Sequence, residues 1–475
     1  MPATGPRLRP ASPADPVAHG DVAESVSAAI WGLEHRNLTV GLILTVSMAA
    51  FEALAVATVL PAAVKDIGGL EWYGWVFSGF MLANLVSITT SGYAADRQGV
   101  ARPFVLGSGL FVIGLLGAGL APTMALVVAS RIAQGLGAGA ISSVAYVAIA
   151  RAYPPQARPR MLAMLSSAWV IPGLMGPALA GAIADHSSWR WVFIGLAPPT
   201  VLASALAVPS LRRLGPSAAA ATATNQTFTA VRLAAGTGTA LFGLGCGDVR
   251  LTAAAMVLGV AVALPALKQL LPAGTLRAAR GLPAAVATVG LLGFAFFAAE
   301  AFLPLSLTEV RGQSMTVSGV ALTAATLMWT TGAWIQARLA GRARRGRLTA
   351  GGLLLIIGGI AGIALVVMTP IPIVLAAIAW GMAGLGMGVA YSTAMLVVLE
   401  SAPAGEEGAA AAAAQVANVL GTALGTGVGG AIVALAAALP AHSTRSGIAL
   451  VDASAIAAAM LALLATRRLP AGPRP

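Results

Sequence analysis

Three ionisable residues interrupt long apolar stretches of this chain. Glu52 lies within one apolar run, Arg131 within a second, and Glu300 near the end of a third. A charged side chain in hydrocarbon costs at least ~2.5 kcal/mol on insertion scales, so it persists where it meets a partner or a cavity. Because burial favours the neutral form of a carboxylic acid, Glu52 and Glu300 are candidates for proton binding. Glu52 is also a candidate contact for a cationic substrate, and the alternative for both is a structural carboxylate bonded to a neighbouring helix.

Arg131 belongs to the segment S-R-I-A-Q-G-L-G-A-G-A at 130–140. An arginine stays charged at any working pH, so it must face an acid, carbonyl groups or water. Gly135 follows Arg131 by four residues and shares its helix face, while Gln134 lies one turn away. Arg131 is therefore a candidate proton-coupling residue, with Gln134 and Gly135 as further candidates in the same segment. A purely structural role for Arg131 is the alternative.

The elements that must position these residues are membrane spans. Hydrophobic residues make up 58% of the chain and charged residues 9%, whereas about 25% charge is usual in soluble proteins. The 475 residues allow about fourteen spans of ~20 residues. Cys246 is a lone cysteine, which excludes an internal disulfide and a cysteine-based metal site, and the four histidines fall in tails or loops. We expect no metal and no cofactor, with protons as the coupling ion.

The apolar runs divide into six, two and six. We expect a disordered cytoplasmic tail at 1–37, a six-helix bundle at 38–210, a linker with two extra helices at 211–281, a second six-helix bundle at 282–466 and a tail at 467–475. The predicted spans are 38–60, 72–95, 103–122, 124–150, 161–184, 189–208, 230–247, 251–271, 283–306, 316–337, 348–369, 371–399, 408–438 and 447–465. Glu52 and Glu300 both have alanine neighbours and a proline soon after, which favours an internal repeat.

Basic residues predict the orientation of these spans. Twenty-two Lys and Arg residues fall in the tails and even-numbered loops, and five fall in the odd-numbered loops. Because positive residues accumulate on the cytoplasmic side, both termini are expected there, in a multi-pass protein of the plasma (inner) membrane. The excess of arginine therefore reports orientation rather than binding to nucleic acid.

Two glycine-rich segments predict moving parts. The span at 161–184 contains W-V-I-P-G-L-M-G-P-A-L-A-G, and its candidate gating residues are Gly173, Gly176, Pro177 and Gly181. Small residues permit close helix approach and prolines bend the helix, which suits a seam where two bodies rock. The segment 92–102 joins the second and third spans, and its candidate residues are Gly92, Asp96, Arg97, Gly99 and Arg102. It predicts a tight cytoplasmic turn whose acid faces the N-terminal end of a helix in the other half.

These segments resemble three signatures of the major facilitator superfamily. The segment at 92–102 resembles the family's loop signature, with Ala101 in place of one basic residue. The segment at 130–140 resembles the fourth-helix motif of proton-driven drug exporters, in which the arginine is thought to aid proton transfer. The segment at 169–181 is similar to their fifth-helix antiporter motif, with Ala180 in place of one glycine. The extra middle pair implies the fourteen-helix drug:proton antiporter branch, which usually carries an Asp in the first helix where this chain has Glu52.

The residues predicted to line a substrate cavity are Glu52, Tyr146, Trp169, Glu300, Trp329, Gln415 and Asn418. For the aromatic residues the alternative is packing. For Gln415 and Asn418 it is hydrogen bonding between helices.

We therefore expect an all-α membrane protein of the major facilitator fold. It would export lipophilic drugs or antibiotics, with lipophilic cations among the candidates, in exchange for protons by alternating access. Its expected partners are small lipophilic substrates and the lipid bilayer, and we expect a monomer. Alternatives are a lipid or metabolite exporter on the same fold, a sugar-type symporter, a channel and a non-transporting scaffold. A membrane enzyme is disfavoured because the spans lack a clustered nucleophile, histidine or metal set.

Overall fold

The computed structural model describes residues 29–215, 226–339, 342–403, 406–439 and 443–470. These residues form helices and connecting turns, with no strand in the described ranges. Eleven helices are long and apolar enough to cross a membrane, where the sequence predicted fourteen spans. Residues 1–28 of the predicted tail at 1–37 and the linker residues 216–225 lie outside the described part of the chain. The end of the predicted tail is ordered, since α2 already begins at Arg36.

Three of the predicted spans are helices that miss this length and hydropathy criterion. They are α3 (Tyr73–Gln98), α10 (Thr227–Leu244) and α13 (Met315–Leu339). Threonine and glycine interrupt all three, and α10 has only 18 residues. Their mean hydropathy is lower than that of the other spans, so length and apolar content alone do not identify them as membrane helices.

The first bundle contains α3 and the helices that precede and follow it. They are α2 (Arg36–Ile67), α4 (Ala101–Gly119), α5 (Met124–Ala152), the broken pair α6 (Arg158–Ser167) and α7 (Val170–His186), and the broken pair α8 (Arg190–Ile194) and α9 (Ala197–Arg212). The second bundle contains α13 with its own neighbours. They are α12 (Leu282–Leu305) with the π-helical turn η4 (Ser306–Val310), α14 (Arg345–Met368), α15 (Val374–Glu400), α16 (Glu407–Ala438) and α17 (Thr444–Ala465) with η5 (Thr466–Arg468).

The two bundles repeat the same packing. In the first, α3 and α4 pack on α5, and α2 packs on α7 and α9. In the second, α13 and α14 pack on α15, and α12 packs on α16 and α17. The contacts between bundles follow the same symmetry, since α7 packs on α13 and α16 packs on α3. Corresponding helices therefore occupy corresponding places, as expected for a transporter built from repeats.

Glycine turns separate the two ends of the molecule. At one end, α2 stops at Gly68, which has φ +69°, and α3 begins five residues later. At the other end, α3 stops at Gly99, with φ +84°, against the carbonyl of Leu214. A left-handed backbone at both positions favours glycine. We call these the Gly68 end and the Gly99 end, and the basic residues predict that the Gly99 end is cytoplasmic.

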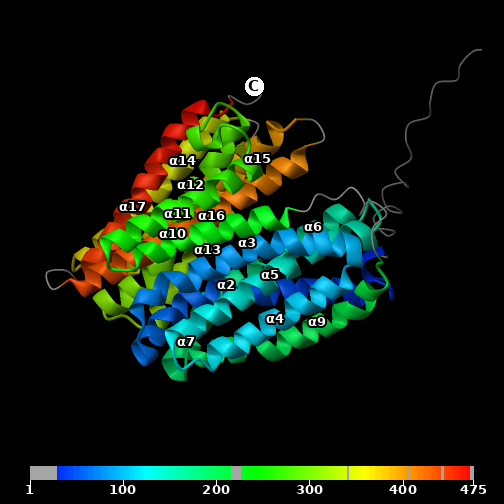
Figure 1. The fold of residues 1–475 in the computed structure, drawn as a ribbon, viewed down its shortest axis with the longest axis horizontal. Coiled ribbons are helices and arrows are strands. Elements are labelled where there is room, and N and C mark those ends of the chain that lie inside the picture. The colour runs from blue at the N-terminus through cyan, green and yellow to red at the C-terminus, as the bar shows by residue number, and fades with distance from the viewer. Residues whose placement is uncertain (1–28, 216–225, 340–341, 404–405, 440–442, 471–475) are drawn as a thin grey trace, which may run out of the picture.

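The inserted pair, α10 and α11 (Val249–Leu270), lies beside both bundles (Figure 1). The pair is held together by small residues, since a Cβ on Gly236 or Gly259 would strike the facing backbone. Helix α10 also packs on α3 and on α16, so it covers one side of the contact between bundles. Figure 1 shows α10 in green between α3 and α16.

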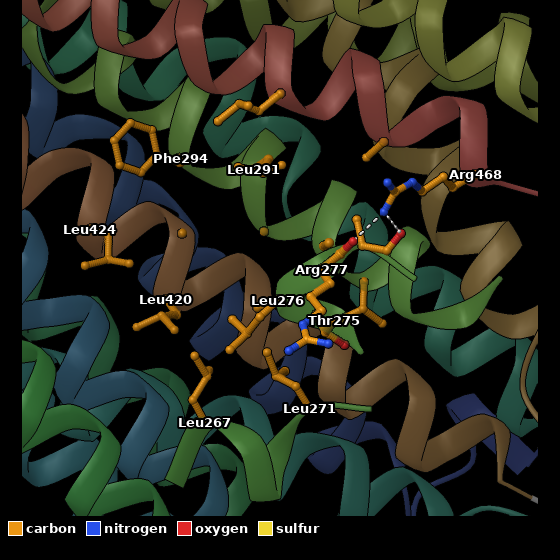
Figure 2. Close-up of a pocket in the computed structure, with 18 of the residues that line it drawn as sticks. Leu267, Leu271, Thr275, Leu276, Arg277, Leu291, Phe294, Leu420, Leu424 and Arg468 are labelled. Atoms are coloured by element: carbon orange, nitrogen blue, oxygen red, sulfur yellow. Dashed lines mark hydrogen bonds between the residues drawn. The ribbon is translucent and has the colours of Figure 1, made fainter. Parts of the chain in front are cut away.

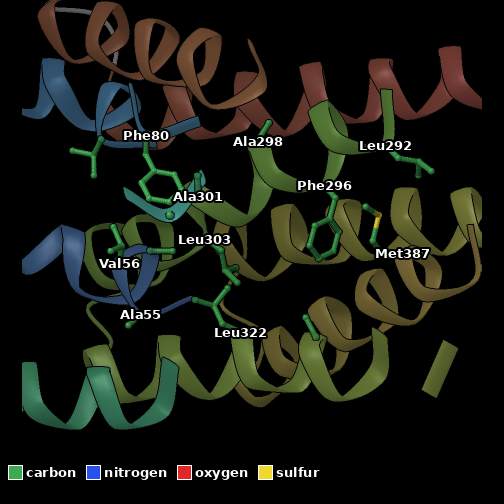
Figure 3. Close-up of a cluster of buried hydrophobic side chains, with 14 of the residues drawn as sticks. Ala55, Val56, Phe80, Leu292, Phe296, Ala298, Ala301, Leu303, Leu322 and Met387 are labelled. Atoms are coloured by element: carbon green, nitrogen blue, oxygen red, sulfur yellow. The ribbon is translucent and has the colours of Figure 1, made fainter. Parts of the chain in front are cut away.

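A continuous apolar core links the two bundles. Figure 3 shows Ala55 and Val56 of α2 and Phe80 of α3 in one buried cluster with Ala301 of α12 and Leu322 of α13. Tyr73 adds a polar link, because its buried hydroxyl donates to the Ala301 carbonyl at 3.0 Å. The two bundles therefore share a packed interface.

Candidate functional site

The structure joins two of the predicted proton-coupling residues in a buried ion pair. Arg131 of α5 donates through Nη1 to Oε1 of Glu52 of α2, and the two side chains are 2% and 1% exposed. The same nitrogen donates to Oε1 of Gln134 at 2.6 Å. The Nε group of Arg131 donates to the carbonyl of Val76 in α3 at 3.1 Å. Three helices of the first bundle thus converge on one guanidinium.

An aromatic ring completes the surroundings of Arg131. Its guanidinium carbon lies 4.1 Å from the centroid of the Phe80 ring, a cation–π geometry. The close approach of α3 depends on Gly135, where a Cβ would strike the carbonyl of Phe80. Because Gly135 lies four residues after Arg131 on the same face, the glycine permits the contact that brings Val76 and Phe80 to the arginine.

Two polar atoms of this network lack a protein partner. Oε2 of Glu52 and Nε2 of Gln134 are buried and accept or donate no hydrogen bond within the described part of the chain. An unpaired buried oxygen is costly, and a proton on Glu52 would remove its charge. Glu52 lines neither the cavity between α11 and the second bundle nor the cavity among α3, α10 and α16. Its place in a substrate cavity therefore stays a prediction.

Glu300 lies in α12 of the second bundle and is half-buried. Neither an ion pair nor a hydrogen bond joins its side chain to any residue in the described ranges. Its neighbour in sequence, Ala301, accepts the hydrogen bond from Tyr73, so Glu300 lies beside the contact of α12 with α3. The structure thus leaves one predicted acid paired and the other unpaired.

An aromatic cluster brings together two of the predicted cavity residues, Trp329 and Gln415, in the second bundle. Trp329 meets Phe296 edge-on at 5.5 Å between ring centroids and lies 6.0 Å from Tyr391. The Tyr391 hydroxyl donates to Oε1 of Gln415 at 2.9 Å. One turn after Gln415, Asn418 has a buried Oδ1 without a hydrogen-bond partner in the described residues.

The other two predicted cavity aromatics belong to the first bundle. Tyr146 is 59% exposed and Trp169 is 47% exposed. Sequence reasoning missed Phe296, although its position four residues before Glu300 places both on one face of α12.

The glycine face of α7 lies against the other bundle. A Cβ on Gly173 would strike Thr326, and one on Gly181 would lie 2.5 Å from the carbonyl oxygen of Met315. The carbonyl of Pro177 is in similar contact with Gly319 of α13. Gly176 points instead to α2, where a Cβ would lie 3.6 Å from the Phe51 ring. Small residues on both helices therefore make this seam, as membrane helix packing requires.

A carboxylate that the sequence did not single out joins the bundles at the Gly68 end. Asp185, in the last turn of α7, accepts hydrogen bonds from the backbone N–H groups of Met315 at 3.0 Å and Thr316 at 2.8 Å. It also accepts from the Thr316 hydroxyl at 2.6 Å. Asp185 thus caps the N-terminus of α13, where the helix dipole favours negative charge.

The predicted loop signature lies at the Gly99 end. Asp96 pairs with Arg151 of α5 at 2.5 Å, within its own bundle rather than with a helix of the other half. Arg97 donates to the Tyr93 hydroxyl at 2.7 Å. Gly99 forms the turn with φ +84°, and Arg102 is exposed. A Cβ on Gly92 would lie 3.1 Å from Oγ of Ser143. Among the described residues, Asp96 makes no ion pair or hydrogen bond with the other half, so the predicted contact is not seen there.

A family model for the Major Facilitator Superfamily matches residues 41–426. This match covers most of the first bundle, the inserted pair and the second bundle as far as the middle of α16, so the chain belongs to that superfamily. Among solved structures, a bacterial homologue of the human lysosomal transporter Spinster, in an inward-facing and unoccupied conformation, aligns with a TM-score of 0.67 at 14% identity. It covers 92% of this chain and 98% of its own. A POT family transporter in complex with 5-aminolevulinic acid aligns with a TM-score of 0.66 at 13% identity, over 89% of this chain and 95% of its own.

Curated relatives match shorter stretches. Multidrug resistance protein 3 of Bacillus subtilis (strain 168) is 32% identical over 158 residues, which is 33% of this chain and 31% of that protein. An uncharacterized MFS-type transporter of Mycobacterium tuberculosis (strain CDC 1551 / Oshkosh) is 32% identical over 306 residues, which is 60% of this chain and 43% of that protein. A probable multidrug-efflux transporter of Mycobacterium tuberculosis (strain ATCC 25618 / H37Rv) is 30% identical over 148 residues, 31% of each. The alignments thus cover less than half the length of these relatives.

Proposed function

We propose that this transporter exports lipophilic compounds, lipophilic cations among them, in exchange for protons. The observation that carries the proposal is the buried contact of Glu52 with Arg131 and its unpaired oxygen Oε2. Relatives named as multidrug transporters support the substrate class.

The chemistry of the network supports coupling to protons. With Glu52 ionised, the pair is neutral overall. With Glu52 protonated, Arg131 becomes an uncompensated buried cation, held by the carbonyl of Val76, Oε1 of Gln134 and the face of Phe80. These partners favour a cation in either state, so the proton can leave and return without loss of the arginine's position. The extra positive charge in the protonated state opposes a cationic substrate, which gives exchange.

We also propose fourteen spans and membership of the fourteen-helix drug:proton antiporter branch. Support comes from side-by-side packing, because α3 packs along α5, α13 along α15 and α10 along α11, and each partner meets the criterion for a span. With the Gly99 end cytoplasmic in the plasma membrane, both termini are on that side. The contact of α7 with α13 at Asp185 then closes the outer side of the transporter. We also propose that the protein works as a monomer.

Transport by purified protein in proteoliposomes tests this function. With a pH gradient and a fluorescent lipophilic cation, we expect gradient-driven uphill dye movement for the unaltered chain and only downhill movement for Glu52→Gln. The matched control is Glu34→Gln, since Glu34 is exposed and lies outside the network. Uphill movement that persists in Glu52→Gln contradicts the coupling role, and absence of uphill movement with every cation tried contradicts the exchange.

A further inference from the structure

A cavity of about 530 Å³ lies away from the seam, between the inserted helix α11 and the second bundle. Its walls come from α11, α12, α16 and α17 and from the turns η3 (Thr275–Arg277) and η5. Figure 2 shows apolar side chains, Phe294 and Leu424 among them, at one end of the cavity and Arg277 and Arg468 at the other. The cavity is thus amphipathic along its length.

The fold explains why this space stays open on one side. Helix α11 packs on α10, and of its described residues only Gly259 and Ala266 are buried. Ala266 joins a small apolar cluster with Leu233 of α10 and Leu420 of α16, which closes the cavity toward the first bundle. The other residues of α11 are exposed or half-buried, so the cavity lies at the edge of the protein where lipid is the solvent.

The polar end is held by a fixed turn. Arg468 donates from Nη1 to the carbonyl of Arg277 at 2.5 Å and to that of Ala278 at 3.2 Å. The turn reverses through Gly274 at φ +89° and Ala278 at φ +46°. A second contact joins this turn to η5, because the N–H of Gly281 donates to the carbonyl of Arg468 at 3.2 Å. The two arginines are therefore neighbours because of backbone contacts, and no acidic residue is needed to join them.

This end of the cavity is positively charged. Arg277 and Arg468 are exposed, and none of the described residues that line the cavity is acidic. The guanidinium of Arg277 makes no hydrogen bond to any residue in the described ranges. Antiparallel packing of α10 on α3 puts the start of α10 at the Gly99 end, and Thr229 near that start contacts Gln269 of α11. The arginines thus lie at the Gly99 end, at the depth of lipid headgroups.

We propose that this cavity binds an anionic phospholipid. One acyl chain lies along Leu267, Phe294 and Leu424, and the phosphate accepts hydrogen bonds from Arg277 and Arg468. Guanidinium groups recognise phosphate through paired N–H donors, and basic pockets between membrane helices suit anionic headgroups. The volume lies within the range of small-molecule sites. The bound lipid fills the space between the inserted pair and the second bundle, which gives that pair a structural role.

Native mass spectrometry of the purified full chain tests the proposal, with dioleoylphosphatidylglycerol or dioleoylphosphatidylcholine added. We expect the phosphatidylglycerol to bind more tightly, and Arg277→Gln with Arg468→Gln to weaken that binding about 30-fold. Leu424→Trp fills the apolar end without a charge change, and we expect it to reduce bound lipid as well. Because Leu424 lies at the other end of the cavity from the turn at Arg277, less bound lipid in Leu424→Trp reports filling of the cavity and not a change in that turn.

The matched control is the double variant Arg280→Gln with Arg467→Gln, which removes the same charge from the same two segments outside the cavity lining. It is expected to bind phosphatidylglycerol as the unaltered chain does. Equal weakening by both double variants overturns the site, as does equal binding of the two lipids. Inorganic phosphate is expected to leave the lipid bound. If inorganic phosphate displaces it, or a lipophilic dye does, the site belongs to a free anion or to a drug.

Discussion

Asp185 is an exposed link between the bundles and offers a sharp test of how they move. It accepts three hydrogen bonds from Met315 and Thr316 at distances of 2.6 to 3.0 Å, so it caps a helix of the opposite bundle. Loss of a helix N-cap typically costs about 1 kcal/mol. Because the cap exists only while the bundles are in contact at the Gly68 end, Asp185→Ala removes this energy from the closed arrangement alone.

An energy of about 1 kcal/mol corresponds to a change of about fivefold in a two-state population ratio. Distance distributions between spin labels measure that ratio, with labels at Lys65→Cys and Val374→Cys in a Cys246→Ala background. Lys65 and Val374 are exposed, one in each bundle. The ratio of short to long distances is expected to fall about fivefold in Asp185→Ala.

The control is Asp248→Ala. Asp248 caps α11 through the N–H groups of Arg250 and Leu251 at 2.8 and 2.9 Å, so it loses a comparable cap inside one structural unit. Its distance ratio is expected to match that of the unaltered chain. An unchanged ratio in Asp185→Ala, or an equal change in Asp248→Ala, refutes the view that Asp185 latches the bundles.

Three further predictions follow from the buried network, the seam and the loop at the Gly99 end. Arg131→Met leaves Glu52 buried without its partner and is expected to destabilise the first bundle by about 3–5 kcal/mol, whereas the double variant with Glu52→Gln recovers most of this loss. Thermal unfolding of the unaltered chain and both variants measures these differences. Equal stability of the single and the double variant would argue against a buried pair. Gly181→Val is expected to shift the spin-label distances toward the long population, because a Cβ there meets the Met315 carbonyl. Gly109→Val, whose Cβ meets open space, is expected to leave the distances unchanged. The same distances in both variants would contradict the role of Gly181 in the contact between the bundles. Asp96→Asn is expected to change thermal stability by less than about 1 kcal/mol because its pair with Arg151 is partly exposed, so a large drop in melting temperature would show that the pair carries more of the fold.

The sequence predicts the helices well because long apolar runs and their glycine or proline boundaries are local signals. It also predicts that Arg131 must face an acid or a carbonyl, and the structure supplies Glu52 and Val76. The identity of those partners was out of reach, since Glu52 lies 79 positions from Arg131 and the two meet only through helix packing. The small-residue face at Gly173 and Gly181 could be read from spacing, but not which helix it would contact.

Other features needed tertiary structure. Asp185 looks like an ordinary acid at a helix end until α13 lies against it. The prediction for Asp96 named a helix of the other half, while the structure pairs it with Arg151, because α5 packs along α3 within the first bundle. The cavity at Arg277 and Arg468 joins residues 191 positions apart and carries no local signature.

Substrate-induced proton release tests the central claim most directly. A lipophilic cation that transports is added to the purified protein in a weakly buffered solution near neutral pH, and the pH change is recorded. The account predicts that protons are released on binding by the unaltered chain and by Glu34→Gln, and that Glu52→Gln binds the cation without release. Equal proton release by Glu52→Gln would contradict the assignment of Glu52 as the residue that exchanges a proton for substrate.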